Sequence, residues 1–270
     1  MTKKADQKGR QAKKPPLQKH KKEEFLIYGW NACLQAFKKR PQDLYRVFFS
    51  KDRARQLGEV KKWCSSRKLP YRELDDVSLR KAAGSVHHGG LVMVTRPTRP
   101  VSIHRLVKQG LARNTLLVAL DRVGNAHNVG AILRSAAYFS ASGLVMTLEE
   151  GQAMITPSVA RTAEGALETV PLYDCKDLPS ALRDLKGKTE GSFILGAEPG
   201  SRRSLYDLEV SFPCVVVLGN ERDGLSSRVK RRCDSLVNIP GSKTMQSLNV
   251  SVAAGIILAE LARRMAENGR

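Results

Sequence analysis

Residues 116–137, LLVALDRVGNAHNVGAILRSAA, decide the fold class of this chain. The apolar run Leu116–Leu120 has the length of a buried strand, the polar residues 121–128 follow it as a loop, and from Val129 onward apolar residues recur at helical spacing. Further apolar runs alternate with helical patterns along the chain, at 144–146, 193–195, 214–218 and 236–239. This alternation predicts an α/β fold in which helices cover both faces of a parallel sheet.

The first hundred residues carry a second, smaller pattern of strands and helices. Residues 44–49 alternate like a half-buried strand, residues 91–94 form a short apolar run, and residues 55–68 suit a helix. Residues 1–24 are rich in Lys and Gln and lack apolar periodicity. We therefore expect four segments: a basic disordered tail at 1–24, a small α/β domain at 25–97, a linker with a short basic helix at 98–113, and a larger domain at 114–270 that ends in a long helix over 247–265.

The charge of the chain is large and unevenly distributed. The 270 residues include 46 basic and 26 acidic residues, for a net charge of +20. The first 113 residues hold +19 of this charge, and the remaining 157 are nearly neutral. A polyanion is the natural partner of such a surface, so we expect the N-terminal half to bind nucleic acid. The basic tail is either a solvated leader or a phosphate-binding arm.

Several classes of protein are excluded by what the sequence lacks. No apolar run reaches the roughly 20 residues of a membrane helix, and the basic N-terminus has no apolar core of a secretory signal. The five cysteines are scattered, odd in number and without a C-x-x-C pair, which predicts reduced thiols in a cytoplasmic protein. No Cys/His cluster has zinc spacing, so we expect neither a metal nor a membrane as partner.

Three polar loops follow predicted strands, at 121–128, 219–226 and 239–251. In open α/β sheets, ligands bind at the carboxyl ends of strands, so these loops are the candidate site. The second loop has the spacing of a phosphate loop, but Leu225 replaces the required Lys, and Glu221 and Asp223 would repel phosphate. Such a loop suits a cationic or neutral ligand, for example a sulfonium.

Each candidate residue in these loops also has a purely structural interpretation. Asn128 stands where the N-cap of the following helix belongs, and Arg134, on the side of that helix opposite its apolar face, suits a solvated position. Ser247 and Asn249 precede the last helix, and they either cap it or face a ligand held at the helix start.

Taken together, the three loops resemble the signature motifs of the SpoU (TrmH-type) RNA ribose 2′-O-methyltransferases of the SPOUT superfamily. The matching segments are NVGAILRSA at 128–136, VVLGNE with GLS within 216–226, and Ile239-Pro240 with SLNVSVAA at 247–254. Order and spacing both agree, over roughly residues 114–266. Residues 25–97 also resemble the small N-terminal substrate-binding domain of the family, with Gly29 early and His88-Gly89 late.

The resemblance implies a trefoil-knotted parallel-sheet methyltransferase domain with a small N-terminal α/β substrate-binding domain. It further implies S-adenosylmethionine bound in the knot, tRNA or rRNA as substrate, and a homodimer with sites at its interface. By position in the motifs, Arg134 would be the catalytic arginine and Asn128 its motif partner, while Glu221 would organise the site. The other residues implied are Ser247 and Asn249 near the methyl donor, and the backbone around Leu218, Gly219, Ile239 and Leu248 as the adenosyl cradle.

Two positions depart from the family pattern. Gly241 stands where Met usually follows the Ile-Pro pair, and Glu164 stands where a small residue usually precedes a Gly-Ala pair. Two roles for Arg134 stay open: a general base, or a cation that holds the adjacent phosphate and stabilises the developing alkoxide. Two other functions stay open as well: an RNA-binding or ribosome-assembly factor that keeps the fold without turnover, and a small-molecule enzyme, against which the charge argues.

Overall fold

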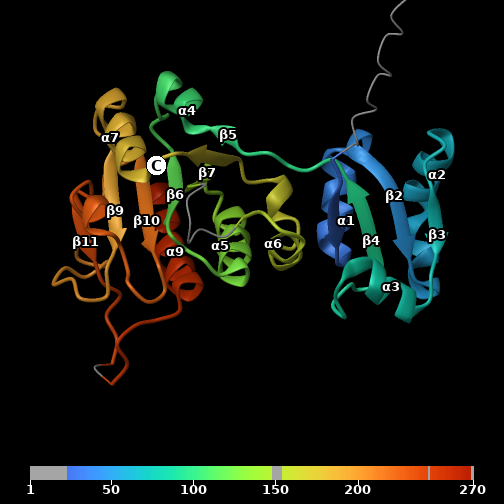
Figure 1. The fold of residues 1–270 in the computed structure, drawn as a ribbon. Coiled ribbons are helices and arrows are strands. Elements are labelled where there is room, and N and C mark those ends of the chain that lie inside the picture. The colour runs from blue at the N-terminus through green and yellow to red at the C-terminus, as the bar shows by residue number, and fades with distance from the viewer. Residues whose placement is uncertain (1–22, 148–153, 243, 269–270) are drawn as a thin grey trace, which may run out of the picture.

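The computed structural model of the chain describes residues 23–147, 154–242 and 244–268 and contains a four-stranded and a seven-stranded sheet. Figure 1 shows the two sheets side by side, the smaller one formed by the first part of the chain. The predicted disordered tail lies outside the described residues except for its last two, Glu23 and Glu24, which pair with Arg99 and Arg46.

The seven-stranded sheet is parallel throughout, as predicted, because each of its neighbouring pairs is parallel. Two of its strands were not expected, β8 and β5, which are short and carry polar residues. In spatial order the strands are β11 (Ser235–Val237), β9 (Phe193–Ala197), β10 (Cys214–Gly219), β6 (Leu116–Asp121), β7 (Gly143–Thr147), β8 (Leu172–Cys175) and β5 (Val101–Ser102).

Helices cover both faces of this sheet, which confirms the second part of the prediction. Successive residues of β6 point to opposite faces, so Leu116, Val118 and Leu120 enter one core and Leu117 and Ala119 the other. The first core is closed by α5 (Ala126–Tyr138), α6 (Pro157–Thr162) and α9 (Val250–Asn268), and the second by α4 (Ile103–Gln109), α7 (Leu178–Lys188) and α8 (Ser227–Lys230).

The order of the strands creates a switch point between β6 and β10. From β6 the chain adds β7 and β8 on one side, whereas β10 returns to the other side of β6. In this pair Asp121 is the register partner of Gly219, so both strands end together. At such a reversal the loops leave the sheet in opposite directions and open a crevice at the carboxyl ends.

The four-stranded sheet confirms the predicted small α/β unit. Its central strands β2 and β4 match the predicted runs, whereas the helix predicted over 55–68 is a 3₁₀ turn at Lys51–Leu57 followed by α2. The sheet order is β1 (Phe25–Tyr28), β4 (Leu91–Thr95), β2 (Leu44–Phe49) and β3 (Tyr71–Glu73), with α1 (Trp30–Lys39), α2 (Gly58–Ser66) and α3 (Asp76–Ala83).

Part of the predicted linker joins the larger sheet. Within residues 98–113, Val101–Ser102 form the edge strand β5 beside β8, and α4 packs on α7. The exact division into domains stays a prediction, and so does the knot, because strand order and pairing alone do not describe how the chain threads. Among the described residues no helix combines the length and the apolar character needed to span a bilayer.

The cysteines are placed where a thiol is inert. No disulfide joins those of the described residues. Burial raises the pKa of the thiols of Cys33, Cys64 and Cys214, and that of Cys233 to about 12. A thiol with so high a pKa stays protonated at neutral pH and is a poor nucleophile, so these four side chains serve as small apolar residues.

The last helix is fastened to the crossover loop between β9 and β10 through Arg264, which Glu260 holds in place. Arg264 donates hydrogen bonds to the carbonyl oxygens of Leu205, Tyr206 and Leu208. Glu260, one turn earlier, accepts from Arg263 and Arg264, and these charged hydrogen bonds lower the pKa of its carboxyl to about 2. Only 12% of the Glu260 side chain is exposed, so the contact is a stabilising one.

We predict that Glu260→Gln lowers the free energy of unfolding by about 1 to 3 kcal/mol at pH 7, because charged hydrogen bonds are lost. The folded pKa of about 2 lies below the unfolded value of about 4.3. The contribution is therefore complete above roughly pH 4.3 and disappears as the pH falls toward 2. Urea unfolding at pH 7, 5.5 and 3 measures it.

Glu267→Gln is the matched control, since Glu267 pairs with the same Arg263 but its side chain is 59% exposed. We expect a change below about 0.5 kcal/mol there. A difference between Glu260→Gln and the unaltered chain that was the same at pH 3 as at pH 7 would contradict the role of the charge.

Candidate active site at the carboxyl edge of the parallel sheet

Asn128 is not needed to cap α5, because another residue of the loop after β6 does so. The N-cap of α5 is Asn125, whose side-chain Oδ1 accepts from the backbone N–H groups of His127 at 2.8 Å and Asn128 at 3.4 Å. The expectation that Asn128 is itself the N-cap is therefore wrong, because the helix begins three residues earlier. Asn128 lies in the first turn, where its side chain is available for another contact.

Asn128 joins the three polar loops through its side-chain amide. It is 5% exposed, its Nδ2 donates to Glu221 Oε1 at 2.7 Å, and its Oδ1 accepts from Asn249 Nδ2 at 3.1 Å. We call Asn128, Glu221 and Asn249 the site triad. Its members come from the first turn of α5 after β6 and from the loops that follow β10 and β11, up to 121 positions apart in sequence. The three loops that the sequence singled out therefore meet at one place.

The loop after β10 is built to hold Glu221 in a fixed turn. Asn220 and Gly224 exchange backbone hydrogen bonds of 3.1 and 3.0 Å, and the side-chain Oδ1 of Asn220 accepts from the N–H groups of Arg222 and Asp223. A Cβ on Gly219 would lie 2.3 Å from the carbonyl carbon of Gly224. Only glycine leaves room for this return of the chain.

Two further bonds tie this turn to the neighbouring strand end. Asn220 Nδ2 donates to the carbonyl oxygen of Arg122 at 2.8 Å, and the buried Asp121 accepts from the N–H of Ser226 at 2.6 Å. Arg122 takes the left-handed φ of 59°, which is unusual for a side chain of this size. The turn and the strand ends thus form one rigid edge, and Asp121, Asn125 and Asn220 are the residues that our sequence argument passed over.

The third loop uses one asparagine for two purposes. Asn249 Oδ1 accepts from the backbone N–H and the hydroxyl of Ser251, at 2.8 and 2.6 Å, and so caps α9, while its Nδ2 belongs to the site triad. The capping interpretation of Asn249 is therefore confirmed, and its role toward a ligand stays a prediction. Ser247 is exposed and caps nothing among the described residues. Leu248 is 49% exposed.

Arg134 stands apart from the triad. It is exposed on α5, and among the described residues no hydrogen bond or ion pair involves it. It lies six positions after Asn128, a rise of about 9 Å along the helix axis. Within one chain, the structure brings Asn128, Glu221 and Asn249 together but leaves Arg134 and Ser247 facing solvent.

The carboxyl edge of the sheet has polar groups suited to S-adenosylmethionine, a molecule with a positive sulfonium and several hydrogen-bond donors. Leu218 and Gly219 end β10 at the switch point, and Ile239 follows β11 at the same edge. Just before Ile239, the side-chain oxygen of Asn238 is buried and has no hydrogen-bond partner in the described part of the chain. In the loop after β10, Glu221 and Asp223 add negative charge to the same edge of the sheet, so the acceptor groups present fit this cofactor.

The two departures from the family pattern have different surroundings. A side chain at Gly241 would meet nothing within 4 Å, so the position tolerates glycine or a larger residue. Glu164 contacts the small unit through Asn31 and also pairs with Arg161. Across residues 23–147, 154–242 and 244–268, no group of three or more His, Cys, Asp or Glu side chains is arranged to hold a metal ion.

Comparisons with known proteins agree on one family. The model of the SpoU rRNA Methylase family matches residues 115–259, and that of RNA 2′-O ribose methyltransferase substrate binding matches residues 26–101. The chain is 30% identical over 244 residues to a protein named uncharacterized tRNA/rRNA methyltransferase YfiF from Escherichia coli O157:H7, covering 90% of this chain and 69% of that one. It is 32% identical over 243 residues to the 23S rRNA (guanosine-2′-O-)-methyltransferase RlmB of Nitrosomonas europaea, covering 88% and 91%.

Solved structures support the fold. An AdoMet-bound rRNA methyltransferase from Sinorhizobium meliloti has a TM-score of 0.72 at 22% identity, covering 89% of this chain and 87% of that one. The SpoU methyltransferase AviRb from Streptomyces viridochromogenes, in complex with AdoMet, has a TM-score of 0.70 at 22% identity, covering 89% and 90%. Because the family model matches more than half of the chain, this chain belongs to the SpoU rRNA methylase family.

Proposed function

We propose that the chain transfers a methyl group from S-adenosylmethionine to a ribose 2′-hydroxyl of structured RNA, either tRNA or rRNA. The site triad carries this proposal, because it assembles the three family motifs at the switch point of the sheet. The family is one of RNA methyltransferases, and the printed name of the RlmB relative supports the 2′-O position. The +19 charge of the first 113 residues suits RNA as the partner.

S-adenosylmethionine supplies an activated methyl group, so the protein has to align the ribose and to help its hydroxyl lose a proton. Backbone groups around Leu218, Gly219, Ile239 and Leu248 would hold the adenosyl part. The orphaned oxygen of Asn238 would accept from one of its donors. Glu221, held by Asn128, would present a carboxylate to the positive end of the ligand.

Arg134 would act on the ribose, either as the base or as the cation beside the phosphate and the developing alkoxide. Its exposed position and its distance along α5 from Asn128 fit a site that a second copy of the chain completes. One turn after Arg134 on α5, the apolar body of Tyr138 is 83% exposed, and Val252 on α9 is 51% exposed. α5 and α9 pack side by side in the same core, so large exposed side chains occur on two neighbouring helices.

The second candidate function is an RNA-binding factor without catalytic turnover. It is considered because Gly241 and Glu164 depart from the family pattern. Both departures have structural accounts that leave the site intact. Gly241 lies in open space, and Glu164 is engaged with the small unit. The triad residues match the family motifs, so the enzyme is favoured.

We predict that the purified chain methylates one ribose in RNA from a strain that lacks the gene. A 2′-O-methyl group blocks the hydroxyl that alkali uses for cleavage, so the new site resists alkaline hydrolysis and can be mapped. Arg134→Ala is expected to lower the rate about 10²- to 10⁴-fold under either role of the arginine, and to leave S-adenosylmethionine binding unchanged by calorimetry.

Arg183→Ala is the matched control, because Arg183 is an exposed helical arginine on α7 that is not part of the candidate site. Full methyl transfer by Arg134→Ala would eliminate both roles of the arginine. Failure of the unaltered chain to bind S-adenosylmethionine would favour the factor without turnover.

The site triad predicts a second result. Asn128→Ala leaves Glu221 without its partner and Asn249 without its acceptor, and we expect about a 10²-fold lower rate from the loss of alignment. Because Asn128 and Asn249 belong to one network, Asn128→Ala combined with Asn249→Ala should cost little more than Asn128→Ala alone. Steady-state rates of the two single variants and the double variant give this double-mutant cycle. Additive losses would show that the two amides act separately, and Asn114→Ala, at an exposed turn before β6, serves as control.

The shared-site arrangement is tested by changing its apolar face. Tyr138→Glu should give a monomer in sedimentation experiments while the unaltered chain sediments as a dimer, because a buried unpaired charge opposes association. Mixing Arg134→Ala chains with Asn128→Ala chains should restore about a quarter of the activity, since half of the random dimers hold one intact site. An absence of recovery after full subunit exchange would mean that each chain uses its own arginine.

A further inference from the structure

The four-stranded unit is docked on the methyltransferase part of its own chain, against α6 and the 3₁₀ turn Ala166–Glu168. Phe25 at the start of β1 packs against the core behind α5 and α6. Figure 1 shows α6 facing α1 across the junction. Two glutamates of the larger part, Glu164 and Glu168, reach across it.

Glu168 forms the more buried contact. Its two carboxylate oxygens accept from Nε and Nη2 of Arg40 at 2.7 and 2.8 Å, and the two side chains are only 4% and 12% exposed. Arg40 also donates to the carbonyl oxygen of Arg96 at 2.6 Å. A bidentate pair fixes orientation as well as distance. Loss of either partner would leave a buried charge alone, so the contact strongly favours the docked arrangement.

Glu164 forms the second contact and explains its departure from the family pattern. One oxygen accepts from Asn31 Nδ2 of α1 at 2.6 Å, and the other accepts from Arg161 at 2.5 Å. Arg161 Nε in turn donates to the carbonyl oxygen of His87, in the loop before β4, at 3.1 Å. Glu164 thus holds together α1, α6 and this loop.

Glycines allow the two units to approach closely at this place. A Cβ on Gly29 would lie 2.4 Å from Cδ of Arg161, and a Cβ on Gly165 would lie 2.5 Å from Cγ of Gln35. Both glycines have positive φ, 94° and 97°, which side chains rarely adopt. Each unit therefore inserts a side chain into a space that the other leaves empty.

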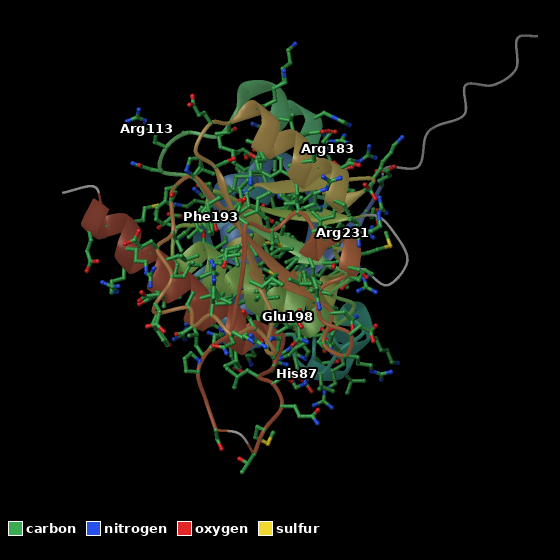
Figure 2. All side chains as sticks on the ribbon, turned by 90° about the vertical axis from the view of Figure 1, so that its left-hand side faces the viewer. His87, Arg113, Arg183, Phe193, Glu198 and Arg231 are labelled. Carbon is green, nitrogen blue, oxygen red and sulfur yellow. The ribbon has the colours of Figure 1, made fainter. Side chains whose placement is uncertain are left out.

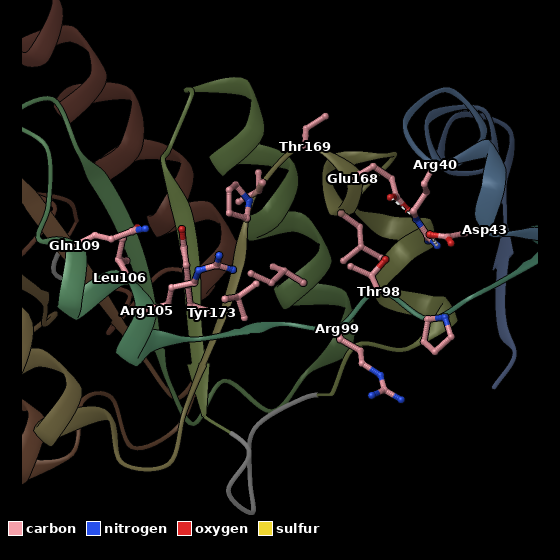
Figure 3. A pocket seen from close by; sticks show the side chains of 16 residues that line it. Arg40, Asp43, Thr98, Arg99, Arg105, Leu106, Gln109, Glu168, Thr169 and Tyr173 are labelled. Atoms are coloured by element: carbon pink, nitrogen blue, oxygen red, sulfur yellow. Dashed lines mark hydrogen bonds and ion pairs between the residues drawn. The ribbon is translucent and has the colours of Figure 1, made fainter. Parts of the chain in front are cut away.

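Away from these contacts the junction is open. A groove with a volume of about 680 Å³ lies between the units. Figure 3 shows the Arg40–Glu168 pair at one end of it and Arg99, Arg105 and Tyr173 along it. The groove leaves part of the junction unpacked, while Phe25 packs against the core of the larger part. Besides this packing, the two glutamates and the glycine contacts fix the orientation of the small unit.

The docked orientation brings two functional ends to the same side of the molecule. In Figure 2, Phe193 at the start of β9 lies above Glu198, which follows its end, and His87 lies at the lower end with Glu198. The carboxyl edge with the site triad and the loop around His87 therefore face the same way. Residues 25–100 carry a net charge of +10, so an RNA on this side can contact both units.

We propose that Glu164 and Glu168 are positioning residues, which fix the small unit so that the methyltransferase site acts on a ribose at a set distance from the RNA element that this unit binds. The inference rests on the proposed function. Its consequence is a restricted substrate class: structured RNAs in which the bound element and the target ribose keep that separation. Neither glutamate contacts the triad, so their effect is on RNA engagement rather than on the chemical step.

Exchanging the amide and the carboxylate of one contact provides the test. Asn31→Asp places two carboxylates together and should free the small unit, whereas Asn31→Asp with Glu164→Gln restores a hydrogen bond with the donor on the other side. Gln56→Glu, which adds the same charge on an exposed part of the small unit, is the matched control. Glu168→Gln is a second, independent variant.

Three quantities are measured on the full-length chain. Energy transfer between labels at Lys62→Cys and Arg113→Cys, in a labelled chain mixed with excess unlabelled chain, reports the orientation of the units. Calorimetry reports S-adenosylmethionine binding, and steady-state kinetics reports KM for RNA and kcat separately. We expect Asn31→Asp to broaden the distance distribution and to raise KM about 10-fold if about a tenth of the molecules stay docked, with kcat and cofactor binding unchanged. The double variant should return KM to within about threefold of its starting value.

The outcomes separate the two levels of inference. No methyl transfer by the unaltered chain contradicts the proposed function. Methyl transfer by the unaltered chain with an unchanged KM in both Asn31→Asp and Glu168→Gln overturns the positioning role. A fall in kcat instead of a rise in KM, an equal effect of Gln56→Glu, or no rescue by the double variant would also overturn it. If Asn31→Asp does not fold by circular dichroism, Glu168→Gln decides the question.

Discussion

The arrangement of the site depends on one constraint: the buried side-chain amide of Asn128 must be hydrogen-bonded. Asn128 lies in the first turn of α5 with almost no exposed surface, and a buried amide without hydrogen bonds is costly. Glu221 and Asn249 satisfy its two ends, so the loops after β10 and β11 have to come to the loop after β6. The parallel sheet supplies the common edge, and the turn around Asn220 supplies the rigidity. The site is therefore a consequence of the same contacts that close the fold at this edge.

The local pattern of apolar residues predicted those strands and helices that have an uninterrupted run or face of buried side chains. β6, β10 and the buried face of α5 follow from apolar runs and helical spacing, and the three polar loops follow from their places after strands. The cap of α5 could not be read in the same way, because Asn125 and Asn128 both suit a cap and only the folded loop selects between them. The strands β8 and β5 were missed because they are short and polar, and their position at the sheet edge is set by neighbours distant in sequence.

The separation of Arg134 from the triad could not be predicted from the sequence either. Helical spacing places it on the exposed side of α5, but spacing within one chain says nothing about a second chain. Glu164 is the opposite case. As a sequence feature it was a departure from a motif, whereas its contacts with Asn31 and Arg161 give it a partner in the other unit. The acidic residues at the junction also offset part of the positive charge of the small unit where that charge would face protein rather than RNA.

The glycines at the junction limit how the two units can change over evolutionary time. Arg161 occupies the space beside Gly29, and Gln35 occupies the space beside Gly165. The surfaces of the two halves are therefore sterically complementary at these two positions. A grafted N-terminal unit from a relative would have to bring a glycine at position 29 for Arg161, a compatible side chain at position 35 beside Gly165, and an arginine at position 40 for Glu168. The two halves are complementary at this junction, so a change of shape in one has to be matched by a change in the other.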